Sequence, residues 1–516
     1  MILYVFYIIM TLFGISFLLP KKSASSYGTA SFSKNSKLLR RKYKGFIIGN
    51  KKFSSNVSTQ HLLLVAPSGS GKTSNMISKN VFHLLSKGHS MIITDPKLEL
   101  WEQSSGWAQN KMDINVSVLN LLNPSKSITW NPLQTVANKN YQGLITDMYE
   151  ITNSKNTSES IWKYGTIEIL TALCKVLASV EDQVYLNLAN LQYLLQYLQA
   201  YPKKTANWLK DQNVDDLTSL SITRFLNQDE KIFHGILSGA ISVIVPFIPD
   251  EIKALTHTTS LPTACEMRKN QSVLFLALPI GKESTYSPYV SLLLTYVFGQ
   301  IMNTPVQGND RYIVGIMEEF GQVFIPNYAS IISTVRSRKM MLLHCLQNID
   351  QLTLRYGEQT AQIIANNCSH WLLLSSIKSD ATLTYVRDSL LGTMTNTKDN
   401  NQENSRYLLT KDEIRRIPKN SGLLISDNLQ PVMVSMKPLF KSYFLMWLYG
   451  LKSNNNQLVS IYPPLSHTDS IHDVKYIPIS EHKKSDTSSE NNELDVSTLS
   501  FREQLKKILP TDNNDS

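Results

Sequence analysis

The apolar residues of this chain fall into short unbroken runs that alternate with stretches of helical spacing. Six further runs follow the first one at 62–65: they lie at 91–94, 273–277, 313–317, 341–345, 371–374 and 423–425. Uninterrupted apolar runs of this length are typical of strands that are buried on both faces of a sheet. Between the first two runs, apolar side chains recur at helical spacing from Met76 to Leu85. The pattern therefore predicts an α/β fold with a mostly parallel central sheet covered by helices.

Residues 140–260 break this alternation. They contain long amphipathic stretches with few β-branched runs, such as LANLQYLLQYLQAY and EKIFHGILSGAISVIVPF. This spacing predicts an all-helical insertion that divides the α/β region into a first part at 61–139 and a second part at 261–451. Residues 452–516 are rich in Asn, Ser and Asp and are expected to be disordered. Within them, FREQLKKIL at 501–509 is either a short partner-binding helix or, as we favour, part of a solvated tail.

The N-terminal residues 2–20 are apolar or weakly polar throughout. As a helix they would reach ~28 Å, which is enough to cross a bilayer core. Lys21 and Lys22 follow at once, and nothing basic precedes them, so 1–20 is expected to be a transmembrane anchor with the rest of the chain in the cytoplasm. A cleaved signal peptide is the alternative, and the missing basic n-region argues against it. The sequence thus predicts a single-pass protein of the cell membrane.

The formal charge of +10 is concentrated near the N-terminus. No Asp or Glu precedes Asp95, and the chain after it is close to neutral. The pI is therefore no argument for nucleic-acid binding. We expect residues 21–60 to form a basic juxtamembrane connector whose charges face anionic head groups. Four cysteines without any CxxC spacing argue against a disulfide framework or a structural zinc site.

A glycine-rich loop lies between the first predicted strand and its helix. A phosphate-binding loop needs small residues so that its backbone N–H groups turn inward, a lysine that reaches the β- and γ-phosphates, and a hydroxyl that ligates Mg²⁺. This loop meets those needs, with alanine rather than glycine at its first position. The sequence therefore predicts ATP and Mg²⁺ binding by Ala66, Pro67, Ser68, Gly69, Ser70, Gly71, Lys72 and Thr73.

Two adjacent carboxylates follow the predicted strand at 313–317. By position, Glu318 would hold Mg²⁺ through water, together with Thr73, and Glu319 would act as general base. Asp95 ends another strand at the same carboxyl edge, where ligands gather in parallel sheets. Gln347 follows a third strand and is a candidate sensor of the γ-phosphate.

Two arginines complete the candidate catalytic set. Arg336 and Arg338 are candidates to contact the nucleotide of a neighbouring subunit or a phosphate backbone. For these two residues, and for Asp95 and Gln347, an ordinary role as a surface or turn residue is the alternative.

Together these motifs resemble the coupling ATPases of type IV secretion and conjugation, the TraG/TraD class. The resemblance covers roughly residues 27–441, and its matching pieces are YGTASF, LLLVAPSGSGKT, IITDPKLE, ITWNPL, IMEEFGQVFIPNYASIISTVRSRKM, LQNIDQL and LTKDEIRRIPKNSGLLI. It implies a RecA-like P-loop motor domain, a cytoplasmic helical insertion, and a homo-hexameric ring. It also implies that single-stranded DNA bound to a relaxase is delivered to the components of a secretion channel in the membrane.

The chain departs from the family pattern at three points. Leu98 stands where the family favours glycine, Glu318 replaces aspartate, and one predicted span replaces the commoner pair. Two alternatives to a DNA-pumping ATPase remain open, the second of them because of Glu318. One is a motor of the same build that exports protein effectors, and the other is a docking platform that binds ATP but hydrolyses little of it.

Overall fold

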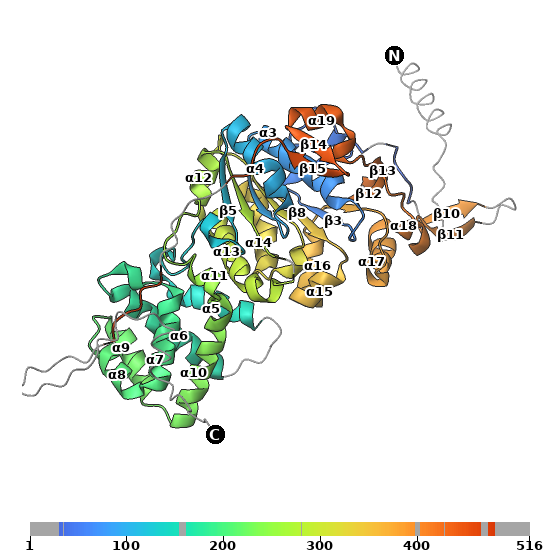
Figure 1. Cartoon of the computed structure of the whole chain (residues 1–516). Coiled ribbons are helices and arrows are strands. Elements are labelled where there is room, and N and C mark those ends of the chain that lie inside the picture. The colour runs from blue at the N-terminus through green and yellow to red at the C-terminus, as the bar shows by residue number, and fades with distance from the viewer. Residues whose placement is uncertain are drawn as a thin grey trace, which may run out of the picture.

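The structure, a computed structural model, describes residues 30–34, 36–153, 161–279, 281–397, 403–427, 429–465 and 473–479. The expected transmembrane anchor and the amphipathic piece at 501–509 lie outside these residues. Figure 1 shows a body built on one large sheet and a separate helical lobe, with the hairpin β10–β11 projecting from the far side of the body.

The central sheet has nine strands, and seven of them are parallel. Its order is β13 (Leu429–Ser435), β12 (Ser421–Ser426), β9 (His370–Leu373), β3 (Leu62–Val65), β8 (Met340–Leu346), β7 (Ile313–Met317), β4 (Ser90–Thr94), β6 (Ser272–Leu276) and β5 (Asn115–Leu119). From β9 to β5 each pair of neighbouring strands is parallel. Strand β12 pairs antiparallel with both β9 and β13. The predicted mostly parallel sheet is thereby confirmed.

The apolar runs supply two cores because successive side chains of a strand point to opposite faces. Leu62 and Leu64 of β3 pack with η1 (Thr73–Ile77), α3 (Ser78–Ser86) and α4 (Glu99–Met112). Leu63 and Val65 belong to the other core. That face is covered by α13 (Glu283–Asn303), α14 (Tyr328–Thr334), α15 (Asp350–Tyr356) and α16 (Glu358–Asn366).

Between β5 and β6 the described chain forms helices only, and most of them make up the lobe in Figure 1. The lobe contains α5 (Tyr141–Thr152), α6 (Ile161–Ser179), α7 (Leu188–Ala200), α8 (Pro202–Lys210), α9 (Asp216–Leu226) and α10 (Glu230–Ile244); α11 (Asp250–Lys253) and α12 (Ala264–Lys269) lead back to the sheet. Among the described residues, Glu230–Phe247 is long and apolar enough to span a membrane. It packs on α6 and α7 through buried Phe233, Leu237 and Ile244, which makes it a core helix of the lobe.

Residues 36–60 depart from the expected connector because they fold onto the body. Phe46 and Phe53 are fully buried, and Asn80 of α3 accepts a hydrogen bond from the Ile47 N–H (2.7 Å). This segment forms the short strands β1 (Ile47–Ile48) and β2 (Lys51–Lys52) and the helix α2 (Ser55–Ser58). The many cations of this segment obscure, in the sequence, the four buried side chains that anchor it: Leu39, Phe46, Ile48 and Phe53.

The polar C-terminal region is also ordered over part of its length, contrary to the expectation of a disordered tail from residue 452. After η9 (Leu439–Lys441) and α19 (Tyr443–Leu448), the hairpin β14 (Leu451–Asn454) and β15 (Gln457–Ser460) packs on α4. Tyr449 stacks on Phe82 and lies edge-on to Trp107. Residues 473–479 then lie against the helical lobe, where Asn190 of α7 bonds to both Lys475 and Ile477.

Candidate nucleotide site

The phosphate-binding loop joins β3 to the helix that begins with η1. Gly69 and Gly71 both have φ of +80°, a backbone conformation that glycine adopts without strain. A Cβ atom on Gly71 would also lie 2.6 Å from the Asn75 side-chain nitrogen, which would then have to shift. The Ala66 N–H donates to the Leu346 carbonyl (2.8 Å). Alanine is therefore accommodated at the first position because it continues the pairing of β3 with β8.

The loop presents polar groups where an anion would bind. The helix that follows Lys72 begins without a side-chain cap, so its N-terminal dipole faces the loop. Pro67 closes a turn by accepting a hydrogen bond from the Ser70 N–H (3.1 Å), while Ser68 is exposed. The Ser70 hydroxyl is buried without a hydrogen-bond partner. These features fit a loop that is completed by a phosphate group.

The two carboxylates after β7 face this loop. Only β8 separates β7 from β3, and both strands end at the same edge of the sheet. The Thr73 hydroxyl donates to Glu318 Oε1 (3.2 Å), and the Lys72 ammonium forms an ion pair with Glu319 Oε1. The Gln347 amide donates to the other oxygen of Glu319, Oε2 (3.1 Å). Five of the residues expected in the site therefore lie within hydrogen-bonding distance of one another.

The backbone around these carboxylates is held firmly. Glu319 has φ of 52°, in the left-handed region that non-glycine residues seldom occupy. Strain of this kind is often found at functional positions, where the surrounding structure must enforce it. Here the Thr94 hydroxyl donates to the Glu318 carbonyl (2.8 Å) and ties the turn to β4.

Burial and neighbouring charges shift the acid–base behaviour of the cluster. Burial raises the pKa of Glu318, although the Lys72 ammonium and the Thr73 hydroxyl oppose the change. For Lys72, burial alone would lower the pKa, but the hydrogen bond and charge of Glu319 outweigh it and leave the pKa raised. Lys72 is therefore held as a cation beside a carboxylate, in the state needed to exchange that partner for a phosphate.

Asp95 is placed beneath this cluster rather than in the loop itself. Its Oδ2 accepts a hydrogen bond from the Trp101 N–H (2.8 Å) in the first turn of α4, and its Oδ1 is buried without a partner. Burial raises the pKa of Asp95 well above its ordinary value, and the nearby charges of Glu318 and Glu99 add to this effect. Leu98, just before α4, has φ of 56°. That conformation explains physically why glycine suits the position.

The two candidate arginines lie at the opposite edge of the sheet. Arg336 and Arg338 belong to η7 (Val335–Arg338), which precedes β8, whereas Gln347 follows that strand. The length of β8 separates the two ends by about 20 Å. The structure therefore does not bring these arginines to the nucleotide site of their own chain. Arg336 is exposed, and the carbonyl of Arg338 accepts a hydrogen bond from Arg268 (2.7 Å).

Comparison with known proteins identifies the family. A family model described as type IV secretory system conjugative DNA transfer matches residues 22–463. The chain belongs to this family.

Individual relatives match this chain either over a short stretch of sequence or in the fold alone. Two conjugal transfer proteins TraG of Escherichia coli are 35% identical over 88 residues and 36% identical over 77 residues. These stretches are 17% and 15% of this chain but only 13% and 12% of the TraG chains. The plasmid coupling protein TrwB with a non-hydrolysable GTP analogue superimposes with a TM-score of 0.65 at 16% identity, over 80% of this chain and 96% of that one. TrwB with ADP and Mg²⁺ gives 0.64 at 16% identity, over 80% and 97%. These structures share the fold of this family member.

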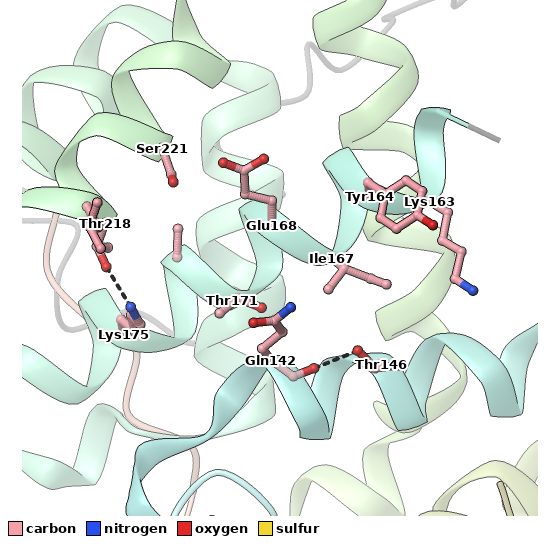
Figure 2. A pocket seen from close by; sticks show the side chains of 12 residues that line it. Gln142, Thr146, Lys163, Tyr164, Ile167, Glu168, Thr171, Lys175, Thr218 and Ser221 are labelled. Atoms are coloured by element: carbon pink, nitrogen blue, oxygen red, sulfur yellow. Dashed lines mark hydrogen bonds between the residues drawn. The ribbon is translucent and has the colours of Figure 1, made fainter. Parts of the chain in front are cut away.

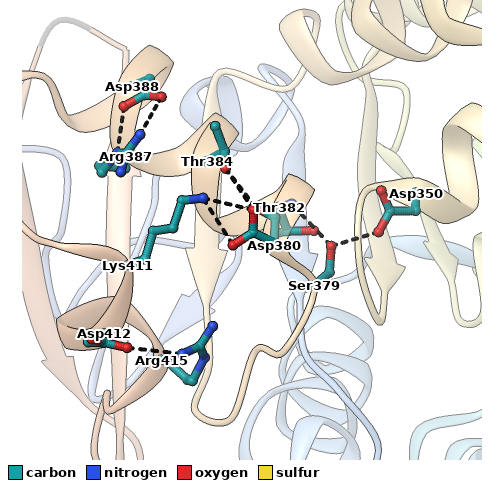
Figure 3. Close-up of polar contacts among 10 residues, drawn as sticks. All are labelled: Asp350, Ser379, Asp380, Thr382, Thr384, Arg387, Asp388, Lys411, Asp412 and Arg415. Atoms are coloured by element: carbon teal, nitrogen blue, oxygen red, sulfur yellow. Dashed lines mark hydrogen bonds and ion pairs between the residues drawn. The ribbon is translucent and has the colours of Figure 1, made fainter.

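In this family member, a polar network that sequence reasoning missed connects the segment after Gln347 to residues 379–411 (Figure 3). The Ile349 N–H donates to the Thr382 hydroxyl (3.0 Å), and the Ser379 hydroxyl donates to Asp350 (2.6 Å). Asp380 then pairs with Lys411 (2.8 Å). The network joins α15 to α17 (Asp380–Tyr385) and α17 to α18 (Lys411–Arg415); η8 (Val386–Leu391), β10 (Thr393–Thr397) and β11 (Glu403–Tyr407) lie between α17 and α18 along the chain. The only sequence signal for the network was the LQNIDQL motif itself.

The helical lobe contains a separate cavity of about 500 Å³ (Figure 2). It opens between α5, α6 and α9, and Lys163, Glu168 and Lys175 line it together with hydroxyl and amide side chains such as Gln142. Lys175 donates to the Thr218 hydroxyl (3.1 Å) across one end. The cavity is lined by both polar and apolar side chains and lies in the helical lobe, so it is not part of the nucleotide site in the body.

Proposed function

We propose that this chain is the ATP-driven coupling motor of a conjugative type IV secretion system. The observation that supports this most directly is the cluster formed by Lys72 and Thr73 of the loop with Glu318, Glu319 and Gln347. Family membership supplies the biological context. The TrwB structures contain nucleotide analogues, or ADP and Mg²⁺, which supports the same ligands here.

The residues present fit ATP and Mg²⁺. The unpartnered Ser70 hydroxyl and the uncapped helix start would receive phosphate oxygens, and Lys72 would exchange Glu319 for the β- and γ-phosphates. Thr73 would ligate Mg²⁺ directly and Glu318 through water; the ion would supply charge neutralisation at the phosphates. Glu319, once released by Lys72, would accept the proton of the attacking water while Gln347 holds its second oxygen.

Glu318 is compatible with hydrolysis on geometric grounds. Its carboxylate already reaches the Thr73 hydroxyl, so its extra methylene is taken up within the cleft. This favours an active motor over a docking platform. An ATPase assay of the full chain decides between them: if turnover is absent with and without single-stranded DNA, and Glu318→Asp restores it, the platform hypothesis holds instead.

The remaining parts of the proposal concern assembly and substrate. Residues 2–20 would anchor a homo-hexamer in the cell membrane by one span, with the bulk of each chain cytoplasmic. Arg336 and Arg338 would then act only across a subunit boundary. The cavity of the helical lobe is our candidate for recruiting the relaxase that carries single-stranded DNA, and a protein-binding role there would equally suit protein-effector export, the second function.

Plasmid transfer tests the proposal. Donor cells with Lys72→Ala should retain folded, membrane-associated protein and lose transfer of a marked plasmid, because the loop backbone remains while the phosphates lose their cation. Lys203→Ala, on the exposed surface of the helical lobe, is the control. Normal transfer by Lys72→Ala contradicts the motor assignment. Loss of DNA transfer combined with intact effector export would separate the two substrates.

A further inference from the structure

Helix α19 presents a large apolar surface away from the body. Tyr443, Phe444 and Trp447 are 85%, 67% and 77% exposed, and Leu448 is 46% exposed. Residues at positions i, i+1, i+4 and i+5 share one side of a helix. The opposite side holds the helix in place, since Met446 is buried. A helix that is packed on the body and still exposes three aromatic rings indicates a binding surface.

The chain around α19 is uniformly basic. Residues 30–60 contain eight lysines and arginines, residues 429–465 contain three lysines, and neither segment contains an Asp or Glu. The cations from Lys34 to Lys44 are exposed, as are Lys437 and Lys441 next to α19. Two exposed aromatic residues, Phe32 and Tyr43, lie among the cations of the first segment.

The two acid-free segments are neighbours in space. The Ser33 N–H donates to the Pro431 carbonyl (3.0 Å) at one end of β13, and Gly49 packs against the Ser435 carbonyl at the other end. Lys79 of α3 donates to the carbonyl of Lys437, which leads into η9 and α19. In Figure 1, α19 accordingly lies beside α3 and β13. We call the exposed side chains of residues 32–44 and 437–448 the basic–aromatic face.

This face lies close to the proposed membrane anchor. Nine residues separate Pro20, at the end of the apolar segment, from Ala30, and the ten steps of fully extended chain between the two span at most ~36 Å. Tryptophan and tyrosine prefer the level of the lipid head groups, and lysines near a bilayer attract anionic lipids. We infer that the basic–aromatic face rests on the anionic lipid surface, with α19 inserted at head-group depth; the inference builds on the membrane anchor of the proposed function.

Other occupants fit the face less well. A second copy of this face would oppose cations with cations, which like-charge repulsion disfavours. Single-stranded DNA would use the cations and stack on the rings, but it gives no reason for the exposed aliphatic Leu448 or for the short tether to an apolar segment. Lipid accounts for the aromatic, aliphatic and basic side chains together.

Fluorescence of the full chain in vesicles tests the inference. Cys265 is exposed and the other three cysteines are buried, so Cys265→Ser gives a background for labelling. A bimane label is attached at Phe444→Cys and, as matched control, at Leu217→Cys, an exposed apolar position of α9 (75% exposed). In vesicles containing phosphatidylglycerol, nitroxide-bearing lipid should quench the label at 444 and leave the label at 217 unchanged. The pair Lys437→Glu and Lys441→Glu should reduce quenching at 444 to the level of the control.

The outcomes separate this inference from the anchor. If the chain floats with the vesicles but the label at 444 is not quenched, the anchor stands and the docking of the face is overturned. If the chain fails to float and the label is unquenched, both fail. Equal quenching in phosphatidylcholine vesicles overturns the anionic preference. If the fluorescence of the label at 444 changes with protein concentration in detergent instead of with lipid, the face binds a second copy. If it changes with oligo-dT instead, the face binds DNA. Either result overturns the inference.

Discussion

The substitution Glu319→Gln isolates the role of the proposed general base. Glu319 accepts a hydrogen bond from Gln347 and pairs with Lys72, and both side chains of the pair are mostly buried (12% and 14% exposed). Glutamine has the same shape, keeps the strained backbone position occupied, and leaves one oxygen for Lys72. It removes only the negative charge and the ability to accept a proton.

The expected effects on stability and on catalysis differ in size. Replacing this mostly buried ion pair by a hydrogen bond from the Lys72 ammonium to a neutral amide costs about 1–3 kcal/mol of folding free energy. General-base catalysis contributes about 10²–10⁴ in rate, which corresponds to about 3–5 kcal/mol of activation free energy. We therefore expect kcat for ATP hydrolysis to fall 100-fold or more while the melting temperature changes by a few degrees.

Steady-state hydrolysis and the binding of a fluorescent ATP analogue measure the two effects separately. Affinity for the analogue should be kept or improved, because Lys72 no longer has to leave a carboxylate. Glu358→Gln, an exposed carboxylate on α16, is the matched control and should be unaffected. A kcat within threefold of the unmodified chain would refute the assignment of Glu319 and direct attention to Glu318.

Three further predictions concern backbone strain, burial and docking. Leu98→Gly should change the free energy of unfolding by no more than about 1 kcal/mol. Leu98→Val should lower that free energy by about 1–2 kcal/mol, because a β-branched residue tolerates the left-handed backbone at this position worst. Chemical denaturation measures both changes. Asp95→Asn should raise the melting temperature at pH 8 but not near pH 3.8, the ordinary pKa of an aspartate. Folding raises the pKa of Asp95, so the folded state is increasingly penalised as the pH rises from the ordinary pKa through the raised one. A difference in melting temperature between variant and parent that is the same at both pH values contradicts this. Asn190→Ala should speed tryptic cleavage after Lys475 by removing the bonds to residues 475 and 477, and an unchanged digestion rate would show that packing alone holds the segment.

The strands buried on both faces were predictable because their apolar runs are continuous. Every strand expected from such a run is present in the central sheet. The edge strands were not recognised. In β5 the burial alternates within the sequence NVSVL, and in β13 the strand contains Pro431, which a sheet tolerates only at its edge. These edge strands are less buried than the central ones, so their sequences carry a weaker apolar pattern.

The site was predictable as far as it follows from strand ends. Lys72, Thr73, Glu318, Glu319 and Gln347 all follow from the rule that parallel strands deliver their loops to one edge. Arg336 and Arg338 precede a strand, and the same rule places them at the other edge. The folding of residues 36–60, 449–465 and 473–479 was missed because a few buried side chains, such as Phe46 and Tyr449, fix segments whose composition is otherwise polar.

The C-terminal segment has a mechanical consequence for the two parts of the molecule. The Leu465 N–H donates to Ser105 of α4 on the body (3.3 Å), and the Lys475 carbonyl accepts from Asn190 on the lobe (3.0 Å). Nine residues lie between these two attachment points, and the ten steps of chain that join them allow the points to separate by no more than about 36 Å. Any rotation of the lobe that moved the points further apart would first have to break one of the two attachments. Insertions between residues 466 and 472 would raise this limit by about 3.6 Å for each added residue.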